Sequence, residues 1–110
     1  MAYDEQVAQR IRDLVAGDLD VTEKKMFGGL AFLVNGNMSV AASSKGGLMV
    51  RLDPDETERL LEQPAVRPFE MRGKAMNGWL RVDDAGFETE EQLREWVDLG
   101  VEYARTLPHK

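Results

Sequence analysis

Residues 26–52 read MFGGLAFLVNGNMSVAASSKGGLMVRL, three apolar runs separated by two turn signals. The stronger signal is Asn35-Gly36, because both central positions of a two-residue hairpin turn need a positive φ. Strands joined by such turns run antiparallel, so the stretch predicts a three-stranded antiparallel meander. The strands are expected over Met26–Val34, Met38–Ala42 and Leu48–Leu52, with the second turn over Ser43–Gly47.

A helix is expected on each side of this meander. The first runs from about Tyr3 to Ala16, and Gly17 supplies its C-terminal stop. Its apolar residues share one stripe at helical spacing: Val7, Ile11, Leu14 and Val15. The second runs from about Pro54 to Gln63, where Pro54 suits the first helical position. Asp53 is expected to cap it, with Glu56 completing a capping box.

The last third of the chain predicts a second hairpin and a third helix. Strands are expected over Arg67–Met76 and Trp79–Val82, joined by the turn signal Asn77-Gly78. The helix runs from about Glu90 to Leu107 behind a capping box of Thr89 and Gln92. Gly100 lies on its apolar stripe, which predicts a close approach to the sheet. The apolar stripe consists of Leu93, Trp96, Val97, Gly100, Val101 and Ala104.

The predicted order is therefore α-β(3)-α-β(2)-α, an α+β fold. We expect an antiparallel-rich five-stranded sheet with the helices mainly on one face. A length of 110 residues fits a single domain spanning residues 1–110.

Charge is divided unevenly along the chain. The segment Lys24–Leu52 holds four basic residues and no acidic one, and Val66–Val82 holds four basic residues and one acidic. These two strand regions carry +7 in a chain whose net charge is −6, so the remaining residues carry −13. We expect an acidic helical layer against a basic sheet.

Strand alternation places the basic residues on one face, because successive side chains point to opposite sides of a sheet. Leu48, Val50 and Leu52 would face the core. The other face would carry an interaction surface rich in Met, Arg and Trp, which suit adaptable interfaces. The candidate residues are Met49, Arg51, Arg72, Lys74, Met76, Trp79 and Arg81. An ordinary solvated sheet face is the competing interpretation.

The segment Lys25, Met26, Phe27, Gly28 and Gly29 is a second candidate. Two glycines inside an apolar strand indicate a bulge, a bend or close approach of a ligand, and the neighbouring lysines could attract an anion. A strand entry with a bulge packed beneath a helix is the structural alternative.

Several kinds of chemistry have no support in the sequence. The chain has no cysteine and one histidine, His109, so we expect no metal site, no catalytic triad and no cofactor. Gly28-Gly29 does not have the spacing of a phosphate-binding loop. The N-terminus lacks the apolar region of a signal peptide, and no apolar run could span a membrane, so a cytoplasmic location is expected.

The run KKMFGGLAFLVNGNMSVAASSKGGLMVRLD at residues 24–53 resembles the signature of the TfoX N-terminal domain family, with its K-x-M-F-G-G strand. The segment FEMRGKAMNGW at residues 69–79 is similar to the family's second hairpin. The resemblance extends over about Ala2 to Leu107 and implies the same α-β(3)-α-β(2)-α order. It supplies no catalytic residues.

Longer relatives carry a C-terminal domain and regulate natural competence with the cyclic-AMP receptor protein. Because this chain ends at Lys110, we expect a stand-alone domain, which weakens the case for a direct role in competence.

These observations favour a non-catalytic regulatory or protein-interaction module of a bacterial cytoplasm, linked to transcription or competence. The expected partner is a protein, such as part of the transcription machinery, or a second copy in a homodimer. Alternatives are a small-molecule or nucleotide sensor at Gly28-Gly29 and, less favoured, an RNA-modifying enzyme. The net charge of −6 disfavours direct nucleic-acid binding, and no membrane partner is expected.

Overall fold

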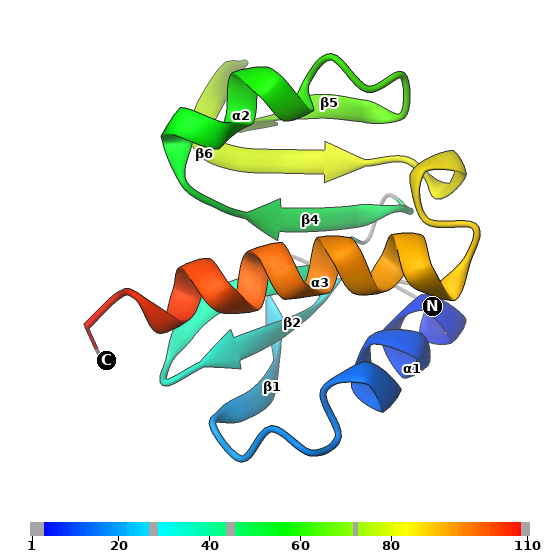
Figure 1. Cartoon of the computed structure of the whole chain (residues 1–110), viewed down its shortest axis with the longest axis vertical. Coiled ribbons are helices and arrows are strands. Elements are labelled where there is room, and N and C mark those ends of the chain that lie inside the picture. Colours follow the sequence, from blue (N-terminus) through cyan, green and yellow to red (C-terminus); the bar gives the residue numbers. More distant parts are fainter. Residues whose placement is uncertain (1–3, 27–28, 44–45, 72, 109–110) are drawn as a thin grey trace.

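The computed structural model describes residues 4–26, 29–43, 46–71 and 73–108 (Figure 1). Its elements form an α+β fold with three α-helices and a six-stranded antiparallel sheet of order β1-β2-β3-β4-β6-β5. The helices are α1 (Glu5–Leu14), α2 (Pro54–Leu60) and α3 (Glu90–Arg105), and a short 3-10 helix, η1, covers Asp84–Gly86. The strands are β1 (Val21–Met26), β2 (Gly29–Val34), β3 (Asn37–Ala42), β4 (Leu48–Arg51), β5 (Val66–Met71) and β6 (Lys74–Val82).

The sheet has six strands rather than the predicted five. The expected strand Met26–Val34 is divided: β1 ends at Met26, β2 begins at Gly29, and these two residues pair across an antiparallel ladder. Residues 22–25 of β1 are polar and exposed. The sequence therefore shows no apolar run there that would indicate a strand. Charged residues are tolerated here because β1 is an edge of the sheet.

The second hairpin also differs from the prediction. The chain reverses between Met71 and Lys74, whereas Asn77-Gly78 lies inside β6. Gly78 has a φ of +88° beside a shift in the β5–β6 register, and its carbonyl accepts a hydrogen bond from the Leu52 N–H at 2.9 Å. Gly78 therefore has the positive φ that the Asn-Gly dipeptide predicts, but it lies at an irregularity within a strand and not in a turn.

All three predicted helices are present, and each is shorter than predicted. Thr89 and Gln92 form the expected capping box, with both hydrogen bonds at 3.1 Å. Asp53 caps α2 by accepting from the Asp55 N–H at 2.9 Å. The capping box predicted for Glu56 was wrong, because the Glu56 carboxylate pairs with Arg59 on the same helix.

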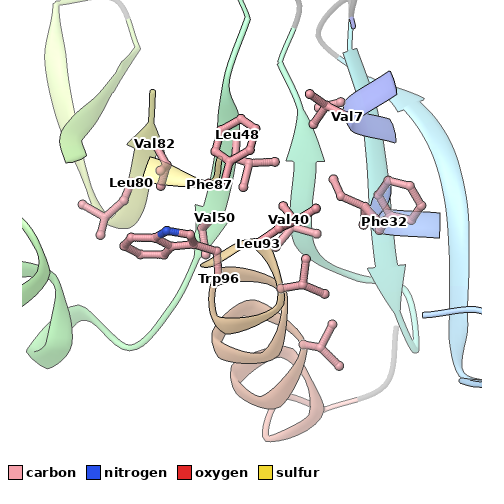
Figure 2. Close-up of a cluster of buried hydrophobic side chains, with 14 of the residues drawn as sticks. Val7, Phe32, Val40, Leu48, Val50, Leu80, Val82, Phe87, Leu93 and Trp96 are labelled. Carbon is pink, nitrogen blue, oxygen red and sulfur yellow. The ribbon is translucent and has the colours of Figure 1, made fainter. Parts of the chain in front are cut away.

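One face of the sheet carries all three helices (Figure 1). Residues from each helix join one buried apolar cluster with β2, β3, β4 and β6, and Figure 2 shows Leu93 and Trp96 of α3 among its residues. Gly100 brings α3 against β3, as predicted. A Cβ atom there would lie 2.7 Å from the Ser39 carbonyl oxygen and 2.8 Å from Val40 Cγ1.

Candidate interaction surface

The pairing of the six strands aligns a row of residues across the face opposite the helices. Directly paired residues share a face. Met49 alternates with Leu48 and Val50, which lie in the helix-side core, so the row belongs to the other face. From β1 to β5 it consists of Lys24, Ala31, Ala41, Met49, Arg81 and Arg67.

The middle of this face is apolar and buried, whereas the sequence predicted an accessible, positively charged surface. Met49 is only 6% exposed and belongs to a second buried cluster with Ala31, Met38 and Ala41. Leu33, Phe69 and Trp79 pack against this cluster. The prediction that Met49 contributes to an accessible surface was wrong, because Met49 is buried within this cluster.

Beside this cluster, Arg51 lies over two aromatic rings, and a third ring lies next to one of them. Arg51 pairs with Trp79 in the β4–β6 ladder, and its Cζ lies 5.3 Å from the Trp79 ring centroid. The same Cζ lies 5.9 Å from the ring centroid of Tyr103 on α3. Phe69 lies next to Trp79, with 6.4 Å between ring centroids. All four are half-buried, and we call them the Arg51 surface.

The Arg51 guanidinium has no ion pair among the described residues. Its position over two aromatic rings is the arrangement of a cation–π interaction, which holds the guanidinium in place and leaves hydrogen-bonding groups for another molecule. The sequence revealed Arg51 and Trp79 through strand alternation. It did not reveal Tyr103, which comes from a helix distant in sequence, or Phe69 on β5.

The other predicted site residues are dispersed. Lys25 pairs with the core residue Leu30, so it lies on the helix side of β1, away from the Arg51 surface. Lys74 is exposed at the β5–β6 reversal, and Arg81 is half-buried and donates to the Gly46 carbonyl at 3.3 Å. Gly29 is buried at the start of β2. Met26 ends β1 and Met76 lies within β6. Phe27, Gly28 and Arg72 lie outside the described residues.

The helix arginines other than Arg94 pair with carboxylates. Arg12 donates two hydrogen bonds to the Glu23 carboxylate, at 2.6 and 2.8 Å, and this lowers the pKa of Glu23. The Asp20 carboxylate accepts two hydrogen bonds from Arg105, which raises the pKa of that guanidinium. On the sheet, Arg67 pairs with Asp83 at 2.9 Å. Arg51 and Lys74 differ, having no such partner in the described part of the chain.

The acidic excess is shared between helices and loops instead of forming a uniform helical layer. By sequence α1 is neutral, α2 carries −2 and α3 carries −3. No helix among the described residues is long and apolar enough to cross a membrane. The same residues contain no group of three or more histidine, cysteine, aspartate or glutamate side chains placed to hold a metal ion.

The family profile described as the TfoX N-terminal domain matches residues 13–104 of the chain. This chain belongs to the TfoX N-terminal domain family. The chain matches no curated protein and no solved structure. Among the described residues of this TfoX N-terminal domain that match K-x-M-F-G-G, Lys24, Lys25 and Met26 end the edge strand β1, and Gly29 begins β2.

Proposed function

We propose that this TfoX N-terminal domain is a non-catalytic regulatory module that captures a protein partner through the Arg51 surface. The observation that carries the proposal is the half-buried residue Arg51, whose guanidinium lies over both Trp79 and Tyr103 and has no carboxylate partner among the described residues. Arginine, tryptophan and tyrosine are the residue types that dominate binding energy at protein interfaces.

The geometry favours a partner that presents a carboxylate beside an apolar side chain. A carboxylate can accept paired hydrogen bonds from the planar guanidinium, and the aromatic rings exclude water around that contact. Since the stack already restricts Arg51, binding would require less ordering of a long flexible side chain. The apolar side chain would lie against Phe69 and Trp79.

The cellular setting belongs to the same proposal. Membership of the TfoX N-terminal domain family supports a regulatory role, and we extend it to a partner within the bacterial transcription machinery. The cysteine-free composition fits a reducing cytoplasm.

Charge reversal at Arg51 tests the proposal. The tagged parent chain, Arg51→Glu and the control Arg94→Glu would be used for quantitative capture from an extract of the source cells. Arg94→Glu changes the net charge by the same amount as Arg51→Glu. Arg94 is an exposed α3 residue without an ion pair among the described residues, so its reversal breaks no described ion pair. We expect Arg51→Glu to capture at least tenfold less of the principal partner protein than the parent chain does. Arg94→Glu should capture as much as the parent.

Melting temperatures show whether each variant is folded. The proposal fails if folded Arg51→Glu captures every enriched protein as well as the parent does. It also fails if both reversals reduce capture equally, because the loss would then reflect net charge.

A further inference from the structure

A groove of about 440 Å³ lies between α2 and α3, on the opposite side of the sheet from the second apolar cluster. Its floor is apolar: Leu60 and Trp96 are each 4% exposed, and Leu99 is half-buried beside them. The Trp96 indole N–H donates to the Gly86 carbonyl at 3.1 Å, which fixes the ring. Figure 1 shows the two helices on one face of the sheet, apart from each other over β4 and β6.

The α3 wall of the groove is acidic. Glu95, Asp98 and Glu102 are exposed and line it, and the described residues offer them no hydrogen bond or ion pair. On the α2 wall, Arg59 already pairs with Glu56 on its own helix. The groove therefore presents an uncompensated negative charge next to an apolar floor.

The spacing of these carboxylates indicates the shape of their ligand. Positions 95, 98 and 102 fall on one stripe and extend along the helix by roughly 10 Å. They do not converge, and the described residues provide no group placed to hold a metal ion. A line of separated negative charges matches a chain that carries several separated cations.

We propose that the α2–α3 groove binds a basic segment of a partner protein. Its lysine and arginine side chains pair with Glu95, Asp98 and Glu102, and an aliphatic side chain between them lies over Leu60, Trp96 and Leu99. Nucleic acid is repelled by this wall, whereas a peptide supplies both the cations and the apolar anchor. This inference does not depend on the Arg51 surface, which has the opposite charge.

A defined peptide tests it. A fluorescein-labelled peptide KKLLKKLKK would be titrated by fluorescence anisotropy against the parent chain and the triple variant Glu95→Gln, Asp98→Asn, Glu102→Gln. The matched control is Glu5→Gln, Asp13→Asn, Glu70→Gln, which removes the same charge from exposed residues on α1 and β5. We expect at least tenfold weaker binding for the groove variant and less than twofold for the control. Equal losses would overturn the proposal.

Two further probes separate a peptide site from a general attraction for cations. Replacing the leucines of the peptide with serine should weaken binding at least fivefold, because the floor would lose its apolar contact. Spermine should compete poorly at the peptide's own concentration. If the serine peptide binds equally well, or spermine displaces the peptide readily, the groove responds to charge alone and the proposal is wrong.

The two tryptophans report which surface is occupied. On adding the peptide, the Trp96 indole N–H resonance should shift in a proton–nitrogen correlation spectrum, and the Trp79 indole should not. Arg51→Glu should bind the peptide as the parent does, so failure here is distinguishable from failure of the proposed function. A shift confined to Trp79 would contradict the groove assignment.

Discussion

At Gly100, α3 lies close against β3. The Ser39 carbonyl that a Cβ would meet belongs to the backbone of β3, so it cannot rotate away as a flexible side chain could. Alanine has a more favourable helix propensity than glycine by about 1 kcal/mol. Overpacking against backbone that cannot move aside falls in the upper part of its usual range, at about 2–3 kcal/mol.

We therefore expect Gly100→Ala to lower the free energy of unfolding by about 1–2 kcal/mol, measured by urea denaturation. Gly17→Ala is the matched control, because no atom lies within 4 Å of a Cβ at that position. It should be neutral or slightly stabilising. Equal stability of Gly100→Ala and the parent would show that α3 does not need this contact.

The dipeptide Asn-Gly occurs twice in the chain and lies in two different kinds of structure. Asn35-Gly36 forms the predicted turn, with φ values of +52° and +85°, whereas Gly78 uses its positive φ inside β6. Local chemistry predicts the backbone angle but not the long-range pairing, here with Leu52, that decides its use. The edge strand β1 was missed for a related reason: its exposed residues show no apolar pattern, and only its pairing with β2 identifies it.

An ion pair ties this edge strand to α1, through Arg12 and Glu23. Because the pKa of Glu23 is lowered in the folded chain, the pair contributes stability above the ordinary value of 4.5. The contribution is lost as the pH falls through the lowered pKa. Both side chains are partly exposed, so the expected size is about 0.5 kcal/mol.

Glu23→Gln should therefore reduce the free energy of unfolding by about 0.5 kcal/mol at pH 7 and by less at pH 3. Glu5→Gln, an exposed residue in the first turn of α1, is the comparison. A Glu23→Gln effect that is equally large at both values of pH would exclude the ion pair as its cause.

The fold class, the three helices and the face on which Met49 and Arg51 lie could be predicted from the sequence. The buried centre of that face could not, because packing by Leu33, Phe69 and Trp79 depends on how distant strands are ordered. The α2–α3 groove was missed for the same reason. The result is a domain with a cationic aromatic surface and, separately, an acidic groove.

The most direct measurement is the Kd of the captured partner for the parent chain and for Arg51→Lys. Lysine keeps the charge but lacks the planar head group that can lie over both rings and make a paired contact with a carboxylate. We expect Arg51→Lys to bind at least tenfold more weakly, with an unchanged melting temperature. An unchanged Kd would contradict the account, because charge alone would then suffice and the stack with Trp79 and Tyr103 would have no part in recognition.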